Sequence, residues 1–165
     1  IIAIIILAKI TMRRGNDALP LLMEAKTLSF KTMELQRVIP LMIALLEYEW
    51  LTGIIIIVKD DIEKTSLLIK GAGIDPETDA FAFWIKKAGR HVIVSNQIAE
   101  AYNISSAAKA SKASVYWKKK GCPYQQALVL FEGNDDDKRN AIAMVQELGA
   151  FAVYEKMKQE MIREV

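Results

Sequence analysis

The stretch ELQRVIPLMIALLEYEWLTG, residues 34–53, carries the pattern that decides the fold prediction. Its apolar side chains recur at the three- and four-residue spacing of one helix face: Leu35, Val38, Ile39, Met42, Leu45 and Leu46. Gly53 ends the pattern, and glycine commonly closes helices because it tolerates a left-handed backbone. The stretch therefore predicts a helix, and Pro40 inside it should kink that helix or delay its start.

The same helical spacing recurs along the rest of the chain. It is found in the segments that begin at Ala18, Phe81, Tyr124 and Ala141, and residues 154–165 place apolar side chains on one side and charged ones on the other. Glycine closes most segments, while Asp, Asn or Pro opens them. Strict alternation of apolar and polar residues, which is typical of strands, is hard to find. The sequence therefore predicts an all-α chain.

Two isoleucine-rich runs, residues 1–6 and 54–58, leave a choice between helix and strand. Short β-branched runs also suit buried parallel strands. Each run continues without a breaker into charged residues, and Asp60 and Lys64 have the spacing of an ion pair on an exposed helix face. We predict helix for both runs, and an α/β fold built on two strands is the alternative.

The segments pair into about five helix hairpins, because short connections make neighbouring helices antiparallel. The hairpins cover residues 1–31, 34–70, 76–103, 106–132 and 135–165. Trp117, Gly121 and Tyr124 fit the opening of a tetratricopeptide repeat. We predict one helical repeat domain over residues 1–165, with about ten helices stacked as a tetratricopeptide-like superhelix. The apolar start without Met suggests a piece of a longer protein.

Composition gives no support to several classes of protein. The 22 basic and 20 acidic residues give a net charge of +2, too little for a broad field that attracts nucleic acid or a membrane surface. The apolar runs end far short of the roughly 20 residues that span a bilayer. Cys122 is the single cysteine, so no internal disulfide forms, and we expect a cytoplasmic protein.

Catalytic and metal-binding patterns are missing from the sequence. It contains no phosphate-binding P-loop string, and His91 is the single histidine. The acidic run at 135–137 is interpreted as a capped helix start, and Asp60 with Asp61 as a solvated helix face. Cys122 lies at a predicted helix start, where its thiol could be activated; the alternative, a small residue in a tight turn, is what the family resemblance described below implies. We expect no enzyme, no cofactor and no metal.

One basic cluster could hold a charged partner. It combines aromatic residues with lysines that could contact phosphates, namely Lys109, Lys112, Tyr116, Trp117, Lys118, Lys119 and Lys120. Trp117 and Tyr124 occupy packing positions of a helical repeat, however, so we interpret the lysines as a solvated face. Direct binding of nucleic acid is not expected.

Several stretches together resemble a known family. WKKKGCPYQQALVLFEG at 117–133 and RNAIAMVQELGA at 139–150 resemble the C-terminal repeat arm of large LuxR-type regulators and related ATPase regulators. RRGNDALPLLMEA at 13–25, residues 34–53 and FAFWIKKAG at 81–89 are similar in order and spacing. The resemblance implies a helical superhelix between an ATPase module and a DNA-binding module, where it senses signals or mediates assembly.

The resulting hypothesis is a protein-binding, regulatory repeat arm of a signal-responsive transcriptional regulator. Its partner would be a neighbouring domain of the same protein or another protein. The first helix of each hairpin usually lines the concave surface, which nominates as partner-binding residues Arg13, Glu47, Lys86, Lys112 and Tyr116. The alternatives are a stand-alone scaffold or homo-oligomerisation module and an α/β enzyme.

Overall fold

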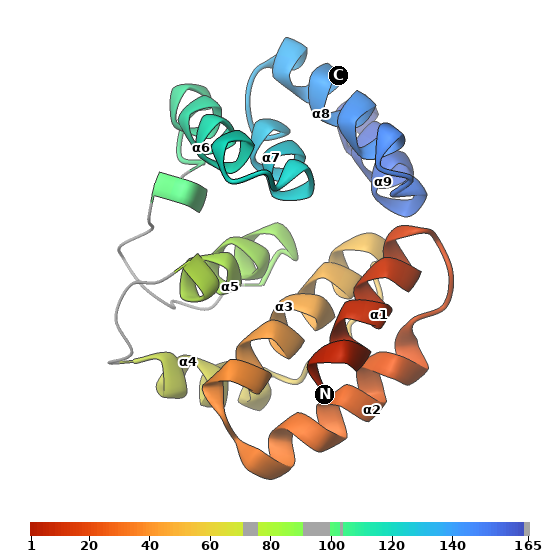
Figure 1. The fold of residues 1–165 in the computed structure, drawn as a ribbon, viewed down its shortest axis with the longest axis vertical. Helices are drawn as coiled ribbons and strands as arrows, with labels where there is room; N and C mark the ends of the chain where they lie inside the picture. Colours follow the sequence, from red (N-terminus) through yellow and green to blue (C-terminus); the bar gives the residue numbers. More distant parts are fainter. Residues whose placement is uncertain (71–75, 91–99, 103, 164–165) are drawn as a thin grey trace. The chain divides into compact units, whose positions relative to one another are not determined.

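Every regular element in the part of the chain that the computed structural model describes, residues 1–70, 76–90, 100–102 and 104–163, is helical (Figure 1). The elements are α1 (Ile2–Arg13), α2 (Leu19–Thr32), α3 (Leu35–Thr52), α4 (Lys59–Ile69), α5 (Pro76–Lys87), the 3₁₀ helix η1 (Glu100–Tyr102), α6 (Ala107–Lys119), α7 (Pro123–Leu130), α8 (Asp135–Glu147) and α9 (Phe151–Arg163). The prediction of an all-α chain is confirmed for these residues.

The helices belong to two compact units. Unit 1 consists of Ile1–Met12 and Asn16–Gln97, and unit 2 of Arg13–Gly15 and Ile98–Val165. Repeat arrays are themselves built from parts that contact mainly their neighbours, so the division does not decide between one repeat domain and two domains. The single domain over residues 1–165 therefore stays a prediction.

Helix α3 is the centre of unit 1, and α2, α4 and α5 all pack on it (Figure 1). Every residue from 41 to 50 is buried, because α3 is apolar around most of its circumference. Trp50 contacts Trp84 of α5 with 5.7 Å between the ring centroids. The helix begins at Leu35 and passes through Pro40, so the proline does not delay its start.

The two isoleucine-rich runs have different structures. The first is helical, as predicted, and forms the start of α1. The second is neither helix nor strand: residues 53–58 have no regular secondary structure, and Val58 is the N-cap of α4. Ile57 is buried, whereas Ile55 is 72% exposed. The prediction of helix for residues 54–58 is therefore wrong.

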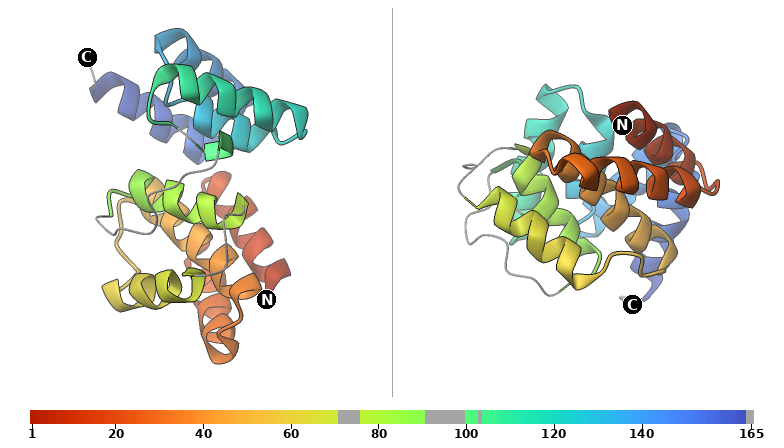
Figure 2. Two further views of the ribbon diagram at one scale, coloured as in Figure 1. Left: turned by 90° about the vertical axis from the view of Figure 1, so that its left-hand side faces the viewer. Right: turned by 90° about the horizontal axis from the view of Figure 1, so that it is seen from below.

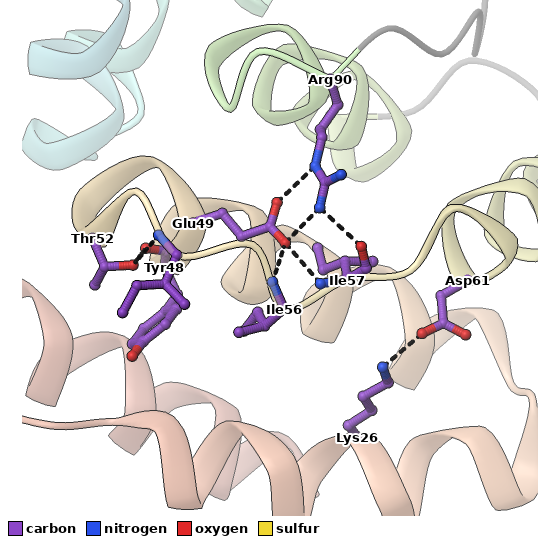
Figure 3. Close-up of polar contacts among 9 residues, drawn as sticks. Lys26, Tyr48, Glu49, Thr52, Ile56, Ile57, Asp61 and Arg90 are labelled. Atoms are coloured by element: carbon purple, nitrogen blue, oxygen red, sulfur yellow. Dashed lines mark hydrogen bonds and ion pairs between the residues drawn. The ribbon is translucent and has the colours of Figure 1, made fainter.

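A buried carboxylate from α3 holds this loop in its non-helical conformation (Figure 3). Glu49 is only 5% exposed, and its Oε1 accepts hydrogen bonds from the backbone N–H of Ile56 at 2.8 Å and of Ile57 at 2.7 Å. In a helix, these N–H groups would bond to carbonyls of the preceding turn. The side chain of Glu49 takes the place of those carbonyls and holds the loop against α3.

Arg90, which follows α5, completes the arrangement (Figure 3). Its Nε and Nη2 donate to the two oxygens of Glu49 at 2.8 and 2.7 Å, and Nη2 also donates to the carbonyl of Ile57 at 2.8 Å. Such a bidentate pair is among the strongest hydrogen-bonded contacts in proteins. We call Glu49, Arg90 and the backbone of Ile56 and Ile57 the Glu49–Arg90 clamp.

A second ion pair joins α2 to α4 (Figure 3). Lys26 Nζ lies 2.6 Å from Asp61 Oδ2, and the Asp61 side chain is 12% exposed. Asp61 is thus a mostly buried partner of Lys26 and not part of a solvated helix face, whereas Asp60 is exposed as predicted. Sequence spacing within α4 does not reveal this pairing, because the lysine comes from another helix.

Unit 2 is formed by α6 to α9, in which each helix packs on the next (Figure 2). The acidic run begins α8, as predicted: Asn134 and Asp137 form a capping box, with the Asn134 side chain accepting from the backbone N–H of Asp137 at 3.0 Å. Asp136 pairs with Arg139 at 2.6 Å, and that hydrogen bond and the carboxylate charge raise the pKa of Arg139. The acidic side chains at 136 and 137 are thus engaged within their own helix.

We expect the clamp to be the largest polar contribution to the stability of unit 1. Arg90→Ala leaves the buried Glu49 carboxylate without its countercharge and should cost about 3 kcal/mol or more in the free energy of unfolding. Glu49→Ala should cost at least as much, because it also leaves two backbone N–H groups and Arg90 without their acceptor. Urea unfolding followed by circular dichroism at 222 nm measures both.

The exposed pair Lys59–Glu63 supplies the control, since its side chains are 78% and 51% exposed. Lys59→Ala should change the free energy of unfolding by less than about 0.5 kcal/mol. Equal urea midpoints for Arg90→Ala and Lys59→Ala would contradict a stabilising role for the clamp.

Candidate functional site on helix α6

The five predicted partner-binding residues lie on four different helices. Arg13 ends α1, Lys86 is exposed in the last turn of α5, and Lys112 and Tyr116 both belong to α6. Glu47 is fully buried in α3, with 0% exposure. The nomination of Glu47 rests on the rule that the first helix of each hairpin lines the concave surface, but α2, α4 and α5 pack on α3 and bury this side chain. Lys112 and Tyr116 are four residues apart on the same helix and are therefore neighbours on its surface.

Helix α6 has one face packed in unit 2 and one face in solvent. Ser106 caps its start by accepting the backbone N–H of Lys109, and Gly121, with φ of 66°, follows its end. The packed face carries Ala110, Ala113, Ser114 and Trp117, which are buried at helical spacing. Lys118 and Lys119 in the last turn complement the helix dipole. The lysines of the outer face are thus compatible with a stable helix.

Trp117 is a packing residue, as the sequence indicated. Its indole Nε1 donates to the carbonyl of Ala101 at 2.7 Å, and its ring contacts Tyr102 and Tyr116 with centroid distances of 5.2 Å. A buried indole whose N–H is already bonded has no face available for a base or another ligand. The candidate site therefore lies on the other side of the helix.

On that side the structure contains a solvent-open hollow of about 380 Å³, which we call the α6 groove. Among the residues that the structure describes, those that line it are Ser111, Lys112, Val115, Tyr116 and Lys119. Side chains four residues apart are neighbours on a helix, and the short Ser111 beside Val115 leaves room between the longer ones. Val115 is 50% exposed, although valine has no polar atom that water could bind. The groove thus combines an apolar centre with a cation at each end.

The electrostatic environment of the α6 groove is strongly positive. The sequence has no Asp or Glu from residue 101 to 131, while this stretch contains Lys109, Lys112, Lys118, Lys119 and Lys120. Among the described residues, no carboxylate forms an ion pair with Lys112 or Lys119. Lys120 Nζ lies 5.8 Å from the centroid of the Tyr116 ring. The net charge of +2 conceals this local excess, although the basic cluster itself is visible in the sequence.

The residues of the groove present positive charge and exposed apolar surface. Lysines and an exposed apolar centre attract an anionic group with an apolar neighbour. Within the described ranges, no three His, Cys, Asp or Glu side chains lie close enough to bind a metal ion, and no helix is long and apolar enough to cross a membrane. His91 lies outside the described residues. The Cys122 thiol donates to the carbonyl of Lys120 at 3.6 Å in the turn before α7.

Comparison of the chain with protein-family models, with curated proteins and with solved structures finds no match. The resemblance to the repeat arm of LuxR-type regulators therefore stays a prediction.

The division of α6 into a packed face and a binding face can be tested by stability. Trp117→Phe removes the donor to the buried carbonyl of Ala101 and should cost about 1–3 kcal/mol in the free energy of unfolding. Lys112→Ala changes an exposed side chain and should stay within about 0.5 kcal/mol of the parent. Urea unfolding measures both, and a Trp117→Phe variant as stable as the parent would contradict the packing role.

Proposed function

We propose that this chain is a protein-binding helical arm and that the α6 groove is its contact surface. The observation that carries the proposal is the exposed apolar centre of the groove between Lys112 and Lys119. Exposed apolar side chains bordered by polar ones are typical of protein-binding surfaces. Stacked helices support such surfaces well, because each helix is held in place by the next.

The wider proposal is that the arm is a tetratricopeptide-like superhelix of a signal-responsive transcriptional regulator. Partner binding would then help to sense a signal or to assemble the regulator. Its support is the resemblance of residues 13–25, 34–53, 81–89, 117–133 and 139–150 to the LuxR-type repeat arm, together with the all-α structure of the described residues. Neither an ATPase nor a DNA-binding activity is proposed for this chain.

A displayed library of random peptides tests the binding surface. The immobilised chain should enrich a set of peptides, and Lys112→Glu/Lys119→Glu should retain less than about a tenth of that set by equilibrium binding, because both ends of the groove reverse charge. The control Lys109→Glu/Lys118→Glu makes the same change in net charge on the same helix, outside the groove lining. Enrichment that is equal for the two variants would assign binding to another surface.

Self-association is a second candidate function, and helix α1 supports it. This helix buries Ile5, Ala8 and Met12 yet also exposes a second apolar stripe, which consists of Ile2, Ile6, Leu7 and Ile10. Helices that are apolar on opposite sides are usually buried on both. A second copy of the chain could cover the outer stripe.

Sedimentation velocity at about 50 µM tests this candidate. At that concentration a dimer whose binding free energy is about −7 kcal/mol is populated. The parent should contain a dimer, and Ile6→Lys/Ile10→Lys should be a monomer because two charges would have to be buried. Leu67→Lys provides the control, since Leu67 is a 68% exposed apolar residue of α4. A monomeric parent would remove the candidate.

A further inference from the structure

We infer that the α6 groove binds an amphipathic helix of another protein, with two carboxylates seven residues apart and a large apolar side chain midway between them. The inference rests on the proposed function, since it specifies the partner of the same surface. Its steps are the sign of the charge, the spacing of the charges and the shape of the surface.

The sign of the charge requires an acidic partner. Lys112 and Lys119 line the groove, and Lys120 lies beside Tyr116. A cationic partner would be repelled by the five lysines of residues 101–131, because this stretch of thirty-one residues contains no carboxylate that would offset their charge. A neutral partner would cover the lysines without replacing the water bound to their ammonium groups. An acidic partner supplies the countercharge that the described residues do not give to Lys112 and Lys119.

The spacing of the charges specifies where the partner's carboxylates must lie. Lys112 and Lys119 are seven residues apart on α6, which corresponds to two turns and a rise of about 10.5 Å. Val115 and Tyr116 lie one turn from each of them, at the middle of the groove. The partner should therefore present a carboxylate, an apolar side chain and a second carboxylate along a line of similar length.

A helix meets this requirement with the fewest constraints. Residues i and i+7 of a helix lie on one face two turns apart, and residues i+3 and i+4 lie between them, which is the pattern of the groove itself. The packed face of α6 already contacts α7 and η1 helix against helix. The outer face, with the short Ser111 beside Val115, presents the groove into which a ridge of a further helix packs.

A nucleic acid fits the same surface less well. Single strands bind by stacking bases on exposed aromatic faces as well as by contacting phosphates. Trp117 is buried, and the half-buried Tyr116 has its ring against Trp117 and near Lys120. The groove centre offers Val115, which has no π-face. Binding of nucleic acid is therefore an outcome of the test and not the proposal.

The test measures fluorescence anisotropy of labelled alanine-rich helical peptides with the full chain. The matched peptide has Glu at positions i and i+7 and Leu at i+3 and i+4. One control moves the second Glu to i+5, off the face, and another replaces both Leu by Ser. The matched peptide should bind at least about tenfold more tightly than either control, and its affinity should fall with added salt.

Charge reversal supplies the sharpest readout. Lys112→Glu/Lys119→Glu should lower the affinity for the matched peptide by about tenfold or more. The same variant should bind a peptide in which both Glu are replaced by Lys. Lys109→Glu/Lys118→Glu should show neither change. Rescue by the reversed peptide cannot come from a misfolded variant. It therefore separates loss of the contact from loss of the fold.

The remaining outcomes are distinct. If the binding of library peptides depends on Lys112 and Lys119 but the peptides have no excess of Asp and Glu, the inference is overturned and the proposed function stands. Enriched peptides that are indifferent to the groove variants would overturn both. An oligothymidylate of twelve nucleotides that binds more tightly than the matched peptide would replace the helix by a nucleic acid.

Discussion

The buried carboxylate of Glu49 is the constraint on which the rest of unit 1 depends. A charge in the interior of a helical core is costly unless donors surround it, and here the donors come from two places far apart in the sequence. The backbone of Ile56 and Ile57 provides one pair, and the guanidinium of Arg90 provides the other. Because both must converge on α3, the end of the α3–α4 loop and the end of α5 are fixed relative to the central helix.

In unit 2 the charged side chains considered above lie at the surface, whereas Glu49 of unit 1 is buried. The lysines of α6 lie on its outer face, whereas Asp137 at the start of α8 is engaged in a capping box and Asp136 in an ion pair within the same helix. The carboxylates therefore stay local while the cations of the groove face solvent. An apolar centre at Val115 turns this positive face into a surface that can discriminate between partners by shape as well as by charge.

Local patterns predicted the helices well, because spacing, caps and glycine stops act over a few residues. The prediction of helix for residues 54–58 was wrong because the pattern within this segment does not show contacts made from outside it. The Glu49 side chain of α3 accepts the N–H groups of Ile56 and Ile57, and Arg90, which follows α5, bonds to the same carboxylate. The predictions that Glu47 and Asp61 are exposed were wrong for a related reason. The pattern within one helix does not show which of its side chains a neighbouring helix will bury. Lys112 and Tyr116 could be nominated from composition, but the groove could not, because it depends on which face of α6 is packed.

The contacts of Glu49 and Thr52 also determine which backbone donors residues 54–58 leave open to another strand. Residues 54–58, with the sequence IIIIV, have the high β-propensity and lack of charge of segments that join intermolecular sheets. Growth of such a sheet needs free backbone N–H groups along one edge. Those of Ile54, Ile56 and Ile57 are bonded to the side chains of Thr52 and Glu49. The side chains of Glu49 and Thr52 thus occupy the backbone donors of Ile54, Ile56 and Ile57 that another strand would require. The isoleucines of this loop can therefore be exposed at the surface without these donors being open to an added strand.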